Sequence, residues 1–80
     1  MKLSYDPRQN IAYIRLQAKT QGVATVRVSD AINVDLAADG TVYGIELLNA
    51  NEQLRQGDGD RFVLENEVTG EHAEVKLPLS

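Results

Sequence analysis

Residues 32–50 read INVDLAADGTVYGIELLNA, and their alternation of apolar and polar side chains predicts a β-hairpin. The loop is Ala37–Gly40, in which Gly40 can take the positive φ that such loops commonly need. The expected register pairs Leu36 with Thr41, Val34 with Tyr43 and Ile32 with Ile45. This register keeps the last two pairs on one face, as a buried face requires.

Shorter strands precede this hairpin and are separated by turn residues. Leu3 and Tyr5 share one face of the first strand, which ends at the turn residues 6–10. The second strand alternates Ala12, Ile14 and Leu16 with Ile11, Tyr13 and Arg15, and the third carries Ala24, Val26 and Val28. The predicted class is α+β and mostly β: an antiparallel meander of short strands with one short helix near residues 50–56 and a C-terminal β-hairpin.

The helix near residues 50–56 is predicted from its ends. Asn49 and Glu52 have the spacing of a capping box, Leu54 offers an apolar contact to the sheet, and Gly57 is a natural stop. So short a helix must dock in order to exist. Residues 57–60 (GDGD) are interpreted as a linker, because one copy lacks the ligand set that calcium needs.

The tail is predicted to form a second hairpin around Thr69-Gly70. A two-residue loop there pairs Leu64 with Val75 and Phe62 with Leu77, and it puts Glu65 unfavourably opposite Glu74. A two- or four-residue loop keeps the pattern, whereas a three-residue loop breaks it. One side is then mostly apolar (Phe62, Leu64, Val68, Ala73, Val75, Leu77) and the other charged (Glu65, Glu67, His72, Glu74, Lys76).

Length and composition indicate one domain over residues 1–80, with a core at 1–56 and an acidic hairpin extension at 57–80. No cysteine is present to form a disulfide, and no Cys/His cluster to bind zinc, so oligomerisation is an open option for stabilising so small a core. Neither a signal peptide nor a membrane-length apolar run is recognisable. A cytoplasmic protein is expected.

The net charge of −4 is concentrated in the tail. Residues 51–80 carry seven acidic and three basic side chains, whereas residues 1–50 carry five of each. An acidic surface repels phosphate, so binding of nucleic acid through the tail is not expected. It suits a small basic protein as partner, or simply a solvated face.

A resemblance supports the β-rich prediction. Tyr5-Asp6-Pro7, Ala12–Leu16, Val34-Asp35, Asp39-Gly40 and Val42–Ala50 match, in order and spacing, a small bacterial family catalogued as domain of unknown function 2283. The match covers residues 2–50, and Ala31 departs from the Gly or Asn often seen before its strand. The resemblance implies a small β-rich domain and carries over no activity and no catalytic residue.

Candidate catalytic and metal sites are weak. His72 is the only histidine and has no cysteine partner, so it is interpreted as a solvated strand residue. Asp35, Asp39 and Glu46 could converge on a metal, but Asp39 is expected to shape its turn and the other two to face outward. Tyr13 and Arg15 are expected to make a cross-strand contact rather than a nucleic-acid stacking pair. No catalytic residue, metal ligand or cofactor is therefore assigned.

The function expected from these features is a non-catalytic protein-interaction or oligomerisation module. An outward-facing apolar patch at Ile11, Tyr13, Val42 and Gly44 suggests an interface, and a homodimer is favoured. The expected interface residues are Ile11, Tyr13, Phe62, Leu64, Val75 and Leu77. The alternative is a small ligand-binding protein or enzyme, with a polar site of Tyr13, Arg15, Asp35 and Glu46 assembled between subunits.

Overall fold

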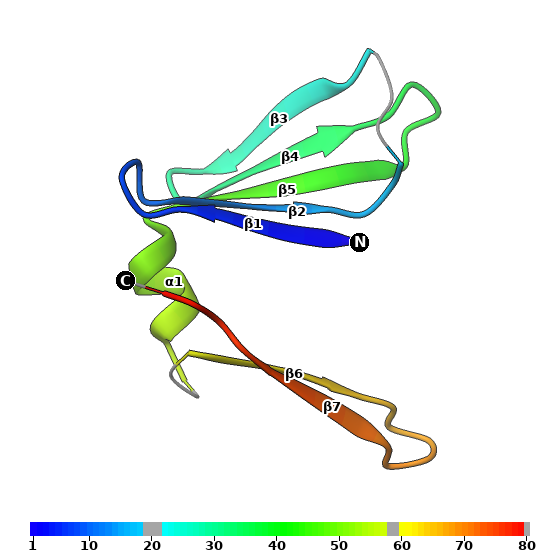
Figure 1. The fold of residues 1–80 in the computed structure, drawn as a ribbon. Coiled ribbons are helices and arrows are strands. Elements are labelled where there is room, and N and C mark those ends of the chain that lie inside the picture. Colours follow the sequence, from blue (N-terminus) through cyan, green and yellow to red (C-terminus); the bar gives the residue numbers. More distant parts are fainter. Residues whose placement is uncertain (19–21, 58–59, 80) are drawn as a thin grey trace.

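The computed structural model describes residues 1–18, 22–57 and 60–79, and its main feature is a five-stranded antiparallel sheet (Figure 1). A short helix and a separate two-stranded hairpin lie beyond one face of this sheet (Figure 1). The elements in chain order are β1 (Lys2–Asp6), β2 (Ile11–Arg15), β3 (Ala24–Ser29), β4 (Ile32–Leu36), β5 (Val42–Leu48), α1 (Ala50–Arg55), β6 (Arg61–Glu65) and β7 (His72–Lys76). The predicted class, α+β and mostly β with one short helix and a C-terminal β-hairpin, is confirmed, although the strands do not follow one another across the sheet in meander order. Of the helices described, none is both long and apolar enough to cross a membrane.

The strand order in the sheet is β1-β2-β5-β4-β3, so two hairpins meet where β2 pairs with β5. After β2 the chain crosses to the opposite edge of the sheet to begin β3 (Figure 1). The β1–β2 turn uses the chemistry expected of it: Asp6 Oδ1 accepts a hydrogen bond from the backbone N–H of Arg8 at 2.9 Å. Asn10 closes that turn with a φ of 57°.

The β4–β5 hairpin is present, but its register is two residues away from the prediction. The structure pairs Val34 with Ile45 rather than with Tyr43. One residue of the difference arises in the loop, where the backbone N–H of Ala37 donates to the carbonyl of Thr41 at 2.8 Å. The loop therefore has three residues and ends at Gly40, whose φ is 87°, a common hairpin geometry.

The second residue of the difference is a β-bulge at Tyr43. Tyr43 lies unpaired between Val42, which is opposite Leu36, and Gly44, which is opposite Asp35. Two shifts of one residue restore the side-chain alternation, because its period is two. Val34 and Ile45 thus share a face as expected, whereas Tyr43 lines a hollow on the opposite face.

Cross-strand partners share a face, so the registers define an apolar face and a polar face of the sheet. The apolar face carries Leu3, Tyr5, Ala12, Ile14, Val26, Ile32, Val34, Ile45 and Leu47. The polar face carries Lys2, Ser4, Ile11, Tyr13, Arg15, Thr25, Arg27, Asn33, Asp35 and Glu46.

Helix α1 forms where expected, but the predicted capping box is wrong. Asn49 has a φ of 54° and makes no side-chain capping bond. Asn10 replaces it from the β1–β2 turn: its Oδ1 accepts from the backbone N–H of Asn51 at 2.7 Å, and its Nδ2 donates to Glu52 at 3.1 Å. Gln53 ties the helix to the sheet by donating to the carbonyl of Ala31 at 2.8 Å. The helix is therefore held by residues distant in sequence.

The C-terminal hairpin also forms with a register different from the one built on Thr69-Gly70. Phe62 pairs with Val75 and Leu64 with Ala73, and a four-residue loop follows Asn66. This loop length is the other one that the sequence favours. It places Glu65 opposite His72 instead of Glu74, which removes the like-charge pair. Of the expected linker at 57–60, residues 58–59 lie outside the described part of the chain.

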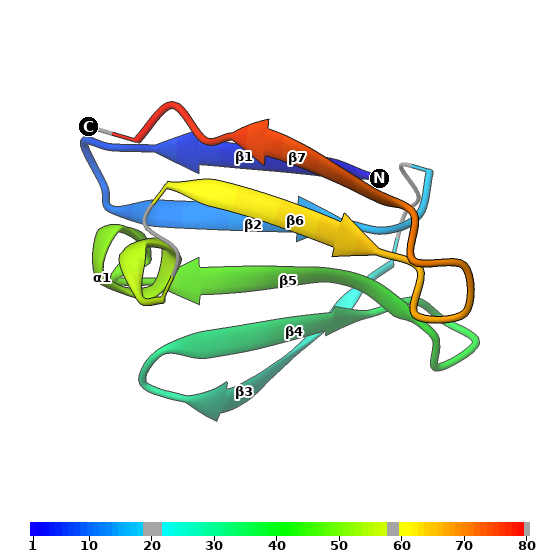
Figure 2. The ribbon, with the colours of Figure 1, turned by 90° about the horizontal axis from the view of Figure 1, so that it is seen from below.

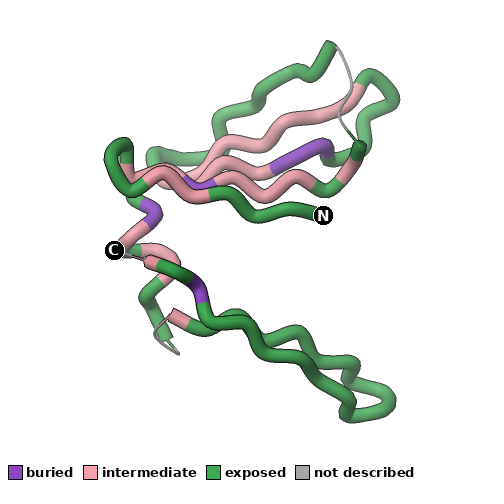
Figure 3. The backbone as a smooth tube through the Cα atoms, viewed as in Figure 1, coloured by how far each residue is buried: buried purple, intermediate pink, exposed green. Residues whose placement is uncertain are grey.

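The core of the chain is thin. Among the described residues only Ala12, Tyr43, Gly44, Ala50 and Leu77 are buried, and every residue of β3, β6 and β7 is exposed (Figure 3). The chain exposes 5934 Å² of surface, whereas a compact 8.8-kDa monomer is expected to expose about 4,800 Å². Its radius of gyration is 13.9 Å, against about 11.6 Å for a compact domain of this length. The chain thus leaves much of its surface without a packing partner.

Candidate functional site

An apolar groove of about 330 Å³ lies between the apolar face of the sheet and the C-terminal hairpin. The sheet side of the groove contributes Met1, Leu3 and Ile14, and the hairpin side contributes Phe62, Val75 and Leu77. Phe62 is 46% exposed and Val75 is 58% exposed, although both side chains point toward the sheet. Large apolar side chains that remain this exposed along one groove are typical of an interaction surface.

The hairpin is attached at one end only. The two arms of the hairpin are joined at this base by a hydrogen bond from the backbone N–H of Leu77 to the carbonyl of Asp60, and Leu77 is only 8% exposed there. From this base, β6 and β7 run away from the sheet toward the 66–71 loop (Figure 1). They pair with each other and with no strand of the larger sheet. The most exposed large apolar residues of the hairpin, Leu64 and Val68, lie away from this base and do not line the groove.

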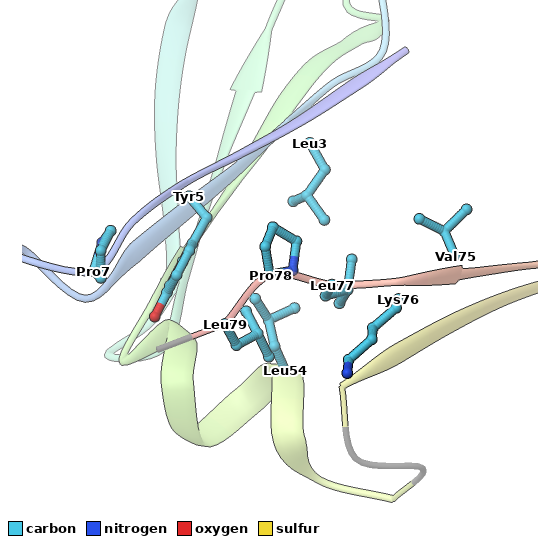
Figure 4. Close-up of a pocket in the computed structure, with 9 residues that line it drawn as sticks. All are labelled: Leu3, Tyr5, Pro7, Leu54, Val75, Lys76, Leu77, Pro78 and Leu79. Atoms are coloured by element: carbon cyan, nitrogen blue, oxygen red, sulfur yellow. The ribbon is translucent and has the colours of Figure 1, made fainter.

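The closed end of the hairpin is packed against α1 and β1. Leu54 and Leu79 lie side by side, and Leu3 and Tyr5 point toward them from β1 (Figure 4). This second hollow has a volume of about 440 Å³ and adjoins the groove, since Leu3, Val75 and Leu77 line both. Leu54 thus makes the contact with the rest of the domain that its position in the sequence predicts.

Part of the apolar face lies outside the reach of the hairpin. Viewed from below, β7 overlaps β1 and β6 overlaps β2, while β4 and β3 extend well beyond them (Figure 2). Val26 on β3 is 45% exposed, and no residue of β4 is buried. The molecule therefore presents two unpartnered apolar surfaces, one on the sheet and one on the hairpin.

The polar face is organised around Tyr13 and Gly44. The Tyr13 ring lies over Gly44: a Cβ added to Gly44 would come 2.5 Å from Tyr13 Cζ. This placement carries the hydroxyl to Asp35, to which it donates a hydrogen bond of 2.6 Å. The other oxygen of Asp35 accepts from Thr25 at 2.6 Å. Tyr13 thus makes the cross-strand contact expected of it.

The Tyr13 hydroxyl is held in its neutral form. Its pKa is raised, first because the group is partly removed from water, and then by the hydrogen bond and the negative charge of Asp35. Tyr43 and Glu46 raise the pKa further. A hydroxyl with a raised pKa that already donates to a carboxylate is suited to joining strands, and poorly suited to acting as a base.

The four residues of the proposed polar site lie on one face but in separate interactions. Tyr13 and Asp35 bond each other, and Glu46 accepts from Asn33 at 2.9 Å. Arg15 lines a hollow of about 220 Å³ with Lys2, Ser4, Tyr13 and Tyr43. No group of three metal-binding side chains occurs among the described residues.

The remaining candidate residues lie apart. Asp39 shapes its turn, accepting from the backbone N–H and the hydroxyl of Thr41, and these bonds lower its pKa. His72 is exposed on β7, on the charged side of the hairpin. The six expected interface residues are divided: Ile11 and Tyr13 are on the polar face, whereas Phe62, Leu64, Val75 and Leu77 are on the apolar side of the hairpin.

The sheet side of the groove is not predictable from the sequence. Leu3 and Ile14 were expected on apolar faces of their strands, but nothing local indicated that β1 lies beside the C-terminal segment. The alternation of Leu3 with Tyr5, and of Ile14 with Ala12, was the available signal. Their common face depends on the β1–β2 register, which pairs Leu3 with Ile14.

Comparison with known proteins identifies a family but no activity. A family model described as "Protein of unknown function (DUF2283)" matches residues 2–51, which include the five-stranded sheet and the start of α1. No curated protein and no solved structure matches the chain.

Proposed function

Because the chain belongs to the DUF2283 family, for which no activity is described, we propose from its structure that it is a non-catalytic protein-interaction module. The interacting surface is the apolar groove together with the uncovered part of the apolar face. One observation carries the proposal: the chain exposes 5934 Å², roughly 1,100 Å² more than a compact monomer of its mass. A stable protein interface buries about 800 Å² on each partner, so the excess is large enough to form one.

The polar face offers less support for the alternative, a ligand-binding or catalytic site. Its best-placed hydroxyl, that of Tyr13, already donates to Asp35. Asp35 also accepts from Thr25, and Glu46 from Asn33, so both carboxylates have partners within the sheet. We propose that these groups hold the strands in register.

A small basic partner is a second candidate, and charge favours it. Glu65, Glu67, Glu71 and Glu74 are all exposed on or beside the hairpin. Such contacts weaken strongly as salt is raised, whereas burial of apolar surface does not. The salt dependence of binding therefore separates an acidic contact from an apolar one.

We propose the cytoplasm as the location, since a cysteine-free chain needs no oxidising compartment.

Photo-crosslinking in the source cell tests the interaction module. A photoreactive phenylalanine analogue replaces Phe62 in the groove, and the matched control carries it at Arg27 on the polar face of β3. The expected result is a covalent protein adduct, whether to the same or another chain, from position 62 and not from position 27. No adduct at position 62, or equal adducts at both positions, would refute the proposal.

A further inference from the structure

We infer that the occupant of this surface is a second copy of the chain, with the β6–β7 hairpin of each copy lying on the apolar face of the other. This inference rests on the proposed interaction function and names its partner. It makes the hairpin an arm exchanged across a two-fold axis rather than a cover for its own sheet.

Self-complementarity supports a second copy. A two-fold interface needs one surface that contains both halves of the contact. This chain carries an apolar sheet face that includes the exposed Val26, and an apolar hairpin side that includes the exposed Leu64. Both surfaces are apolar, so the hairpin of one copy can bury the sheet face of the other, and the reverse.

The hairpin itself requires a support that its own sheet does not supply. A two-stranded hairpin is at best marginally stable in water. Here all ten strand residues of β6 and β7 are exposed, and only Leu77 at the base is buried. The uncovered β4 and β3 region of a second sheet would supply that support without moving the base (Figure 2).

The area is sufficient for a dimer. The excess exposed surface of roughly 1,100 Å² per chain exceeds the 800 Å² or so that each partner contributes to a stable interface. The charged side of the hairpin, which bears Glu65, Glu74 and Lys76, would remain in solvent. No charged side chain therefore needs to be buried in the contact.

The absence of cysteine in the sequence allows a direct test by engineered disulfides. One tagged chain carries Val26→Cys on β3, and a differently tagged chain carries Leu64→Cys on β6. Mixing and mild oxidation should yield a disulfide joining the two tags. The matched control, Arg27→Cys with Leu64→Cys, uses the opposite face of the same strand and should yield little. Equal yields for the two pairs would overturn the inference.

Sedimentation equilibrium gives an independent measure. Full-length protein should be a dimer at high micromolar concentration, and Leu64→Lys should raise its dissociation constant at least about 30-fold, as loss of a central apolar contact does. Val63→Lys, one residue away on the charged side of β6 and opposite Glu74, should leave the dimer unchanged. Leu64 is 63% exposed within one chain, so this variant should keep the wild-type circular dichroism.

The failures of the two proposals can be told apart. A monomeric protein with no tag-to-tag disulfide, but with a photo-adduct to a different protein at position 62, overturns the exchanged hairpin and leaves the interaction module standing. A monomer with no adduct at position 62 overturns both.

Discussion

Gly44 shows how one missing side chain organises the polar face. Without a Cβ, Gly44 leaves room for the Tyr13 ring to cross β5 and reach Asp35 on β4. A single hydroxyl on β2 thereby bonds a carboxylate on β4 across the strand that lies between them. The bulge at the neighbouring Tyr43 is part of the same arrangement, since it is the step that sets Gly44 opposite Asp35.

We therefore predict that Gly44→Ala destabilises the domain by about 1–3 kcal/mol, the usual cost of overpacking. The added Cβ would meet Tyr13 Cζ at 2.5 Å, and the ring would have to move away from Asp35. In a Tyr13→Ala background the same change should cost little beyond the change in backbone preference. Urea denaturation of the four proteins of this double-mutant cycle measures the coupling. Additive effects would contradict the proposed packing.

Gly40 is constrained by its backbone conformation and not by its surroundings, since there is room for a side chain at this position. Its φ is 87°, and no atom lies within 4 Å of an added Cβ. Gly40→Val should cost roughly 1–3 kcal/mol, because a β-branched residue resists positive φ, whereas Gly40→Asn should cost clearly less. Chemical denaturation compares the two variants. Equal losses would mean that the loop does not need the left-handed conformation.

At the level of elements, α1 is held to the sheet by polar side chains that come from the β1–β2 turn and from the helix itself. Asn10 binds the first turn of the helix, and Gln53 binds the carbonyl of Ala31. A helix of six residues has little stability of its own, so these bonds and the contact of Leu54 decide whether it forms. The helix is therefore a consequence of the sheet.

A pair of glycine variants tests this dependence. Asn10 and Asn49 both have positive φ, so glycine fits either backbone and only the side-chain bonds differ. Asn10→Gly should cost about 1 kcal/mol or somewhat more, because it removes the side-chain hydrogen bonds to Asn51 and Glu52, whereas Asn49→Gly should be nearly neutral. Thermal or urea unfolding followed by circular dichroism measures both. A larger loss of stability for Asn49→Gly than for Asn10→Gly would mean that Asn49 caps the helix, as the sequence alone predicts.

The Asn10 variant should also change the acid response. The hydrogen bond from Asn10 is the main cause that lowers the pKa of Glu52, so the bonded carboxylate stabilises the fold above its unfolded pKa. That contribution is lost as the pH falls through the lowered folded pKa. The stability difference between wild type and Asn10→Gly should therefore narrow on acidification. A difference that is constant or widens toward low pH would contradict this coupling.

At the scale of the whole molecule, the thin core and the open hairpin are two aspects of one property. A chain of 80 residues without disulfides has little apolar surface to bury, and this chain leaves part of that surface exposed. A partner that covers both apolar surfaces would supply the missing burial. Folding and association should then be linked through protein concentration.

We accordingly expect the melting temperature of the full chain to rise with protein concentration. A chain truncated after Gly57 loses the hairpin and the Leu77–Leu79 contacts, so it should melt lower and show no such rise. Differential scanning calorimetry over a wide concentration range measures both chains. The link between folding and association would be contradicted if the melting temperature of the full chain did not change with protein concentration and the truncated chain were equally soluble and stable.

The sequence by itself determined the elements and their turns. Period-two alternation located the strands, Gly40 and the Asp6-Pro7 turn ended them, and the tail was correctly interpreted as an amphipathic hairpin. These features depend on local backbone preferences and on the polarity of neighbouring residues, and short stretches of sequence determine both. Shifting a strand by two residues preserves the alternation, so the registers of both hairpins were not determined in this way.

The tertiary structure alone decided which distant groups meet. The bulge at Tyr43, the capping of α1 by Asn10 and the contact of Tyr13 with Asp35 each join residues on separate elements. The same is true of the groove, whose two sides come from opposite ends of the chain. Such contacts depend on how whole elements pack together, and no local pattern of residues specifies that packing.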